Sequence, residues 1–400
     1  MASPNGADRE DVRRLVASAR ALAPVLRGRA AAAEAAEAIQ PETVADLAEA
    51  GLMRLLQPAR VGGMEADFVA LFEIAAELAR GDASVAWVWA GSASRHWILG
   101  MFPQGAQDAV WRTRPDALIA SSFVFPGGRA ERAQDGWRLS GRWPFASGAA
   151  ASDFMMLGAL APLDAAIGED AEYRLFLLPR GDCRVLDTWR SAGLRGTGST
   201  DVEADGVFVP DHMSVAVPAL AGGECPGAAL NPGALYRLPV FALLPFTLAG
   251  VALGNAQACL EEFVSEARLR ASRQNLARMA DFQTVQIRLA AAAAQIDAAR
   301  LTLAAPCVEA MARAAGGEPP DLRLKTRWRR DAAFAVGLCT QAVSGLVAAS
   351  GAGGLAADGA MQRRFRDAHA ASAHIDFNFD VAGSHYGRVV LGLPSENPVL

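Results

Sequence analysis

The sequence predicts a mostly helical α+β protein in which a helical part, a β part and a second helical part follow one another. Residues 1–117 carry apolar residues at helical spacing, residues 118–215 carry short β-type runs between turns, and residues 236–400 return to long helical patterns. A stretch rich in Gly, Pro and Ala, residues 216–235, is predicted to link the last two parts.

Capping residues mark the helices of the N-terminal part. Pro41 opens a helix that Gly51 closes, because Pro suits the first helical turn and Gly suits the position after the last. The apolar residues of 66–80 repeat at three and four positions, which predicts the next helix. Asp82 or Ser84 can cap the helix that follows it.

The β part and the second helical part are equally regular. Short β-type runs separated by turns such as Asp135-Gly136 predict hairpins, and therefore a small β barrel or sandwich. Residues 281–311 and 322–350 predict long helices. The uncharged stretches 238–260 and 332–357 are long enough to span a membrane but weakly apolar, so we expect helices buried in a bundle or a subunit interface and no membrane contact.

Composition excludes several classes of protein. The 400 residues are 52% hydrophobic with a net charge of −5, and this acidic balance argues against nucleic-acid binding. Five cysteines without a CxxC pair argue against a zinc ribbon or a disulfide framework. The five histidines show no pair four residues apart, so we expect no metal site. The first residues lack a signal-peptide pattern, which predicts a cytoplasmic protein.

Three polar residues have two interpretations when only their surroundings in the sequence are considered. Ser147 lies between predicted strands, where a serine is typical of a turn. His96 lies on a largely apolar helix, where a histidine is often a hydrogen-bonded core residue, and the same interpretation applies to His374. Each could instead contribute to an active site.

Several segments, taken in order, resemble the acyl-CoA dehydrogenase superfold. They cover both helical parts and the β part: residues 58–63, 73–80, 136–144, 192–210 and 296–300. This resemblance implies an N-terminal helical domain, a middle β-barrel domain and a C-terminal four-helix bundle.

Within that superfold the sequence is more similar to flavin-dependent monooxygenases, namely the oxygenase components of two-component phenol and hydroxyphenylacetate hydroxylases. Residues 143–148, 366–374 and 382–393 carry this similarity. It implies a homotetrameric enzyme that takes reduced FMN or FAD, with FMNH2 favoured, from a separate NAD(P)H–flavin reductase. The flavin would react with O2 to a C4a-hydroperoxide that hydroxylates a small phenol-like aromatic compound.

Two other enzymatic interpretations remain, beside a flavin-binding protein without activity. An acyl-CoA dehydrogenase needs a carboxylate base, and the position that carries its Glu in the common motif holds Ile375, which cannot accept a proton. Asp376 lies one residue further on, so this departure argues against dehydrogenation without excluding it. A relative that oxygenates nitrogen or sulfur is the other alternative.

The similarity also implies how the flavin is held. Ser147 matches the serine that hydrogen-bonds flavin N5, and His374 matches the histidine beside the oxygen adduct. Trp143 would pack near the isoalloxazine ring, and Arg273 would bind the flavin phosphate across a subunit interface.

Substrate contacts are implied in the same way. His96 and Ser122 match residues that contact the reacting oxygen of the substrate, and a histidine can draw a proton from a phenol near neutral pH. The pocket must exclude water to protect the oxygen adduct. Its apolar walls are expected from aromatic side chains: Trp87, Trp89, Trp97 and Phe123.

Overall fold

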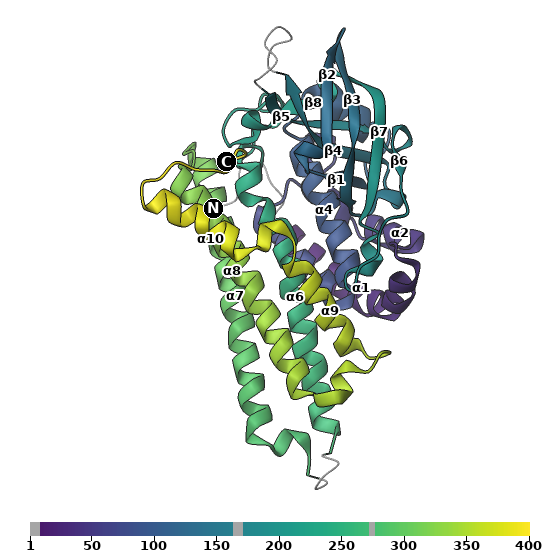
Figure 1. Cartoon of the computed structure of the whole chain (residues 1–400), viewed down its shortest axis with the longest axis vertical. Helices are drawn as coiled ribbons and strands as arrows, with labels where there is room; N and C mark the ends of the chain where they lie inside the picture. The colour runs from purple at the N-terminus through teal and green to yellow at the C-terminus, as the bar shows by residue number, and fades with distance from the viewer. Residues whose placement is uncertain (1–8, 163–170, 272–276) are drawn as a thin grey trace.

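The computed structural model describes residues 9–162, 171–271 and 277–400, and it confirms the predicted fold class (Figure 1). Helices, a sheet and further helices follow one another along the chain. The α-helices are α1 Arg9–Ala36, α2 Pro41–Glu49, α3 Phe68–Gly81, α4 Ala83–Leu99, α5 Gln104–Trp111, α6 Val240–Leu269, α7 Gln283–Gly316, α8 Leu322–Ala349, α9 Ala360–Ser372 and α10 Phe379–Val390. The strands are β1 Ile119–Ser122, β2 Gly128–Ala133, β3 Gly136–Ala146, β4 Phe154–Pro162, β5 Ala171–Pro179, β6 Arg184–Val185, β7 Thr200–Pro210 and β8 Ser214–Ala216.

Helix α4 is central to the N-terminal part. Asp82 is its N-cap, because the Asp82 carboxylate accepts hydrogen bonds from the backbone N–H groups of Ser84 at 2.7 Å and Val85 at 3.3 Å. Nearly every residue of α4 is buried, so the helix has no solvent-facing side. It packs against strand β1, helix α3 and helix α6 and therefore joins all three parts of the chain.

The described residues of the β part form one eight-stranded sheet. The strand order is β6-β7-β3-β2-β4-β5-β8, and β1 pairs in parallel with β4. Strands β2 and β3 form the hairpin predicted at Asp135-Gly136, with Asp135 in the left-handed region at φ 58°. Register shifts between β3 and β7 fall at 139–141 and 143–146, just before the loop that carries Ser147.

The long helices α6, α7, α8 and α9 form the C-terminal bundle (Figure 1). Helix α6 also packs tightly on α3, because two of its residues are glycines. A Cβ on Gly254 would lie 2.0 Å from the backbone oxygen of Ala76, and a Cβ on Gly250 would lie 2.4 Å from that of Phe72. These contacts join the bundle to the N-terminal helices.

Two helices are long and apolar enough to span a membrane by length and composition alone, α6 and α8. The most apolar window of α6 is 94% buried inside the protein, which is typical of a core helix, whereas that of α8 is 50% buried. Both cover the uncharged stretches noted in the sequence.

Substituting Gly254 tests the close approach of α6 to α3. We expect Gly254→Ala to lower the free energy of unfolding by about 1–3 kcal/mol, because the added methyl group must displace backbone. Gly28→Ala on α1 is the matched control. Nothing lies within 4 Å of its Cβ position, so the variant should gain up to about 1 kcal/mol from helix propensity. Denaturant unfolding of both variants measures the difference, and equal effects would contradict the packing argument.

Candidate active site

His374 lies directly after α9 and next to α4. Its ring is in edge contact with Trp87 of α4, with the ring centroids 5.6 Å apart, and its side chain is 37% exposed. The Asp376 backbone N–H donates to Nδ1 at 3.3 Å, so Nδ1 is unprotonated and the neutral ring carries its proton on Nε2. Burial lowers the pKa of His374, with Asp376 opposing and Arg329 and Arg95 adding to the shift. His374 is therefore a neutral N–H donor near pH 7.

Ser147 belongs to a chain of hydroxyl groups at the end of β3. Its Oγ lies 2.7 Å from Ser199 Oγ, which lies 2.7 Å from Thr197 Oγ1. Thr197 Oγ1 donates to the carbonyl of Leu194 at 2.7 Å, and a carbonyl can only accept. Ser199 must then donate to Thr197, and Ser147 must donate to Ser199. The remaining capacity of the Ser147 oxygen is therefore to accept a hydrogen bond.

The loops that carry Ser147 and His374 meet the same turn of α4. Gly148 has φ 73°, and a Cβ there would lie 2.7 Å from a methyl carbon of Val88. Val88 is adjacent to Trp87, the residue that His374 contacts. The structure therefore brings two of the predicted catalytic residues, Ser147 and His374, to one end of α4.

A contact between the β part and α9 fixes this arrangement. The Asp367 carboxylate of α9 accepts from the backbone N–H of Leu194 at 2.7 Å. Burial raises the pKa of Asp367 to about 7, with Asp82 adding to the shift and Leu194, Arg364 and Arg366 opposing it. A Cβ on Gly193 would lie 2.2 Å from the backbone oxygen of Arg366, so the loop and the helix are in direct contact.

Phe145 is a candidate site residue that the sequence analysis missed. It lies two residues before Ser147 and is 66% exposed, with φ 62° in the left-handed region. A bulky residue with this backbone conformation is rare and often marks a functional site. The signal in the sequence is weak, because Trp143 of the same segment is the larger aromatic residue.

Trp143, which is predicted to pack near the isoalloxazine ring, lies in the core of the β part. Trp143 is fully buried, and its indole N–H donates to the carbonyl of Gly158 at 2.6 Å. The ring lies against Gly128, where a Cβ would be 2.3 Å from it. Near this end of β3, Phe145 is therefore the exposed aromatic residue and Trp143 is the buried one.

The structure argues against the predicted role of His96 as a substrate base. His96 is nine residues from Trp87, which is two and a half helical turns and therefore the opposite side of α4. Its Nε2–H donates to the Ala117 carbonyl at 2.8 Å, and its Nδ1 accepts from the Trp111 indole at 3.0 Å. Burial lowers its pKa to about 4, with smaller opposing effects from Ala117 and Asp116. His96 is a neutral, hydrogen-bonded core histidine.

The other predicted substrate residues lie at the end of β1. Side chains alternate along a strand, so Ser122 points away from Ser121 and Phe123. The Ser122 hydroxyl donates to the Pro144 carbonyl of β3 at 2.7 Å, whereas the Ser121 hydroxyl accepts from Arg95 Nε at 2.6 Å. The hydrogen bond to Pro144 argues against the predicted substrate contact of Ser122.

Phe123 is half-buried, and the Arg95 guanidinium lies 4.4 Å above its ring. Of the other aromatic residues predicted to line the pocket, Trp87 contacts His374. Trp89 and Trp97 are core residues whose indoles donate to the carbonyls of Leu52 and Leu235. Arg273 lies outside the described residues.

Asp376 is not available as the base of a dehydrogenase. Its carboxylate forms an ion pair with Arg329 at 2.7 Å. Burial alone would raise the pKa of Asp376, but Arg329, His374 and Arg95 together lower it. Ile375 is 63% exposed and has no acid–base chemistry.

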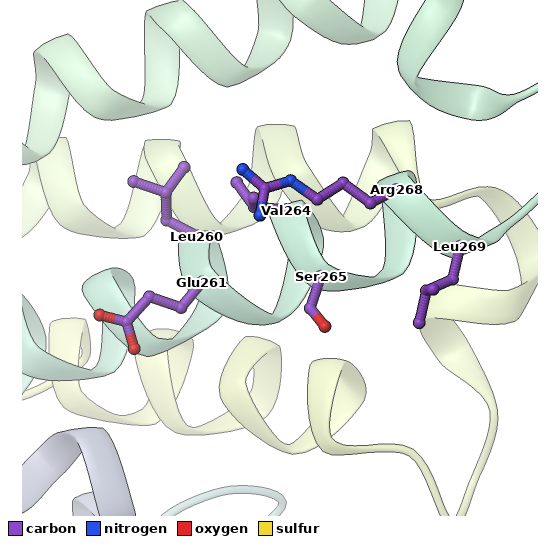
Figure 2. Close-up of a pocket in the computed structure, with 6 residues that line it drawn as sticks. All are labelled: Leu260, Glu261, Val264, Ser265, Arg268 and Leu269. Carbon is purple, nitrogen blue, oxygen red and sulfur yellow. The ribbon is translucent and has the colours of Figure 1, made fainter.

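An open pocket of about 400 Å³ lies elsewhere, along the last turns of α6 (Figure 2). Its lining comes from this helix alone: Leu260, Glu261, Val264, Ser265, Arg268 and Leu269. None of the predicted catalytic residues lines it. Among residues 9–162, 171–271 and 277–400, no three His, Cys, Asp or Glu side chains gather as metal ligands.

Comparisons with known proteins match this chain along almost its whole length. Residues 9–111 match the family model described as acyl-CoA dehydrogenase, N-terminal domain, and residues 246–379 match acyl-CoA dehydrogenase, C-terminal domain. The chain is 35% identical to the FADH(2)-dependent resorcinol hydroxylase, oxygenase component, of Rhizobium sp. (strain MTP-10005), over 95% of this chain and 94% of that protein.

Two solved structures have nearly the same fold as this chain. The 3-HSA hydroxylase from Rhodococcus sp. RHA1 superposes with a TM-score of 0.91 at 32% identity, covering 97% of this chain and 99% of that one. XiaF from Streptomyces sp., in complex with FADH2 and glycerol, superposes with a TM-score of 0.90 at 29% identity, covering 98% of both chains.

The buried state of His96 predicts a pH dependence of stability. The pKa of His96 is about 4 in the folded chain and ordinarily 6.5, so the unfolded chain binds the proton more tightly. The contribution of neutral His96 to the free energy of unfolding is therefore present above pH 6.5 and is lost as the pH falls towards 4.

His96→Gln removes the titration. Between pH 7 and pH 5 we expect the gap in unfolding free energy between wild type and His96→Gln to shrink by about 2 kcal/mol. A gap independent of pH, measured by urea unfolding, would contradict this assignment.

Proposed function

The chain belongs to the oxygenase components of two-component flavin-dependent monooxygenases, which carry the acyl-CoA dehydrogenase fold, and within that family we propose specific roles for its site residues. It is an oxidoreductase that uses reduced flavin and O2 to hydroxylate an aromatic substrate. When bound, the reduced flavin supplies two electrons and activates O2. The acyl-CoA dehydrogenase alternative is not favoured, and the ion-paired state of Asp376 agrees with this.

The observation that carries the proposal is the meeting of Ser147 and His374 at one turn of α4. Ser147 is left as an acceptor by its hydroxyl chain, and N5 of a flavin carries a hydrogen only in the reduced form. An accepting Ser147 therefore suits reduced flavin. The exposed ring of Phe145 would cover an isoalloxazine ring beside it. These residues fit the cofactor that the family uses.

His374 is proposed as the proton-holding group of the site. Its neutral ring offers Nε2–H as a donor to oxygen atoms near the flavin, while Asp376 fixes the ring through Nδ1. The Trp87 and Phe377 rings beside it limit the access of water. Exclusion of water favours transfer of oxygen to the substrate over release of peroxide.

The flavin, its source and the compartment are proposed from the relatives and the cysteines. The resorcinol hydroxylase, at 35% identity, is named FADH(2)-dependent, and XiaF, at 29% identity, was solved with FADH2, so we propose reduced FAD in place of the FMNH2 favoured by the sequence. An NAD(P)H–flavin reductase would supply it. The five cysteines are free thiols, which supports a reducing, cytoplasmic setting.

The predicted homotetramer is supported by α7. Every seventh residue forms an exposed stripe of Ile287, Ala294, Leu301 and Val308, with Leu301 70% exposed. The α6 pocket has walls from a single helix, so a second copy of the chain could supply the opposite wall (Figure 2). We propose that copies of this chain cover these apolar surfaces.

Ser147→Ala tests the role of the hydroxyl chain. With a flavin reductase, NADH and resorcinol, we expect the ratio of hydroxylated product to hydrogen peroxide to fall about tenfold, because one hydrogen bond is lost. Ser152→Ala is the control, since among the described residues its hydroxyl bonds to Ala149 and Met155 and not to Ser147. An unchanged ratio in Ser147→Ala would exclude this role.

Thr197→Val gives an independent check on the direction of the hydrogen bonds. Without the Thr197 hydroxyl, Ser199 is free to donate to Ser147 instead. The preference for reduced over oxidised flavin, measured by anaerobic calorimetry, should then decrease.

Leu301→Asp tests the proposed assembly. A charge in the α7 stripe should dissociate the tetramer, because burying an unpaired carboxylate at an interface is unfavourable. Light scattering after gel filtration should give the mass of four chains for wild type and a smaller mass for the variant. Val25→Asp on α1 is the control, because Val25 is also an exposed apolar residue at 42% but lies outside the stripe. An unchanged mass for Leu301→Asp would contradict the proposal.

A further inference from the structure

Arg95 is a buried cation without an anionic partner among the described residues. Its side chain makes two short hydrogen bonds, from Nε to Ser121 Oγ at 2.6 Å and from Nη1 to Ser94 Oγ at 2.9 Å. Both partners are neutral, and no carboxylate of residues 9–162, 171–271 and 277–400 forms an ion pair with it. The whole residue is only 8% exposed. Buried charges are normally paired, so this one requires an explanation.

Arg95 shares a face of α4 with the residue that contacts His374. Trp87, Gly91 and Arg95 are spaced by four residues and therefore lie along one side of the helix. The Cβ position of Gly91 meets nothing within 4 Å, so open space lies over the middle of this face. Trp87, whose ring contacts His374, lies at one end of this face, and Arg95 lies at the other.

One face of the guanidinium lies against an aromatic ring. Arg95 lies over the ring of Phe123, and Phe123 contacts Phe241 of α6 with the ring centroids 5.9 Å apart. The third nitrogen, Nη2, has no hydrogen-bond partner among the described residues and is not among the buried unsatisfied atoms. An apolar wall and one unused N–H group together suit an aromatic molecule that carries a polar substituent.

The charged groups around Arg95 carry one more positive charge than negative charges. Arg95 and Arg329 both act on Asp376, but the Asp376 carboxylate already pairs with Arg329 at 2.7 Å. His374 is neutral, so two guanidinium groups face one carboxylate and one positive charge remains. Burial lowers the pKa of Arg95 to about 10, opposed by Asp376, so the group stays protonated near pH 7.

We propose that Arg95 determines substrate specificity by binding a negatively charged oxygen on the aromatic substrate. This inference rests on the proposed function and names its substrate class: an aromatic compound with a ring carboxylate or an ionised hydroxyl group. Arginine binds such oxygens through charge-assisted hydrogen bonds. The hydroxyl groups of Ser121 and Ser94 hold the guanidinium in place without neutralising it.

The test compares 2,4-dihydroxybenzoate with resorcinol, which differ by one carboxylate, in wild type, Arg95→Gln, Arg95→Lys and Ser121→Ala. Binding is measured by anaerobic calorimetry with reduced FAD present, and turnover is measured as kcat/KM for hydroxylated product. If a carboxylate is the anion, dihydroxybenzoate binds wild type at least about tenfold more tightly than resorcinol, and Arg95→Gln removes that preference. Arg95→Lys should recover part of it, because the charge is kept.

If an ionised hydroxyl is the anion, resorcinol itself depends on Arg95. Wild type should then bind resorcinol with the ultraviolet absorption of the phenolate at pH 7, and Arg95→Gln should bind it without this absorption and about tenfold more weakly. Ser121→Ala should change neither result by more than a few-fold, since it leaves the charge in place.

Three outcomes would overturn the proposal. The first is that all variants bind both compounds equally and without the absorption of a phenolate. The second is that Arg95→Gln loses the binding of reduced FAD, and the third is that a folded Arg95→Lys recovers none of the substrate binding. The last two would assign Arg95 to the cofactor or to the fold. If Arg95-dependent binding is found but no aromatic compound is hydroxylated, the anion site stands and the proposed activity is wrong.

Discussion

The contact between Asp367 and the backbone N–H of Leu194 is the constraint on which the site depends. The loop that contains Leu194 continues into Thr197 and Ser199, whose hydroxyl groups orient Ser147. Helix α9, which carries Asp367, ends two residues before His374. One buried carboxylate therefore fixes the positions of Ser147 and His374 relative to each other, although they belong to different parts of the chain.

Helix α4 provides the second constraint, because its opposite sides perform different tasks. The side of Trp87, Gly91 and Arg95 faces open space and His374. The side of His96 is closed by hydrogen bonds to Trp111 and Ala117 and supports the core. A helix buried on all sides can hold functional groups rigidly, since each one is locked by packing on the side that faces away from the pocket.

The site combines few polar groups with apolar surroundings. His374 is neutral, Asp376 is paired with Arg329, and Ser147 has its proton committed to Ser199. Such an arrangement supplies donors and acceptors at fixed points without free protons, which suits chemistry that water would divert to peroxide. Arg95 is the exception, because its charge has no ion-pair partner among the described residues.

Sequence patterns alone determined the order of helical, β and helical parts, because helical spacing, turn residues and caps such as Asp82 act over a few neighbours. The resemblance named the family and selected Ser147 and His374, whose loops the structure brings to one turn of α4. Only the tertiary structure could decide which side of a helix or strand faces the pocket. It turned His96 and Trp143 into core residues and brought forward Arg95, Ser121 and Phe145. The reason is physical: a hydrogen bond such as that from Trp111 to His96 joins residues whose proximity depends on packing rather than on their spacing in the sequence.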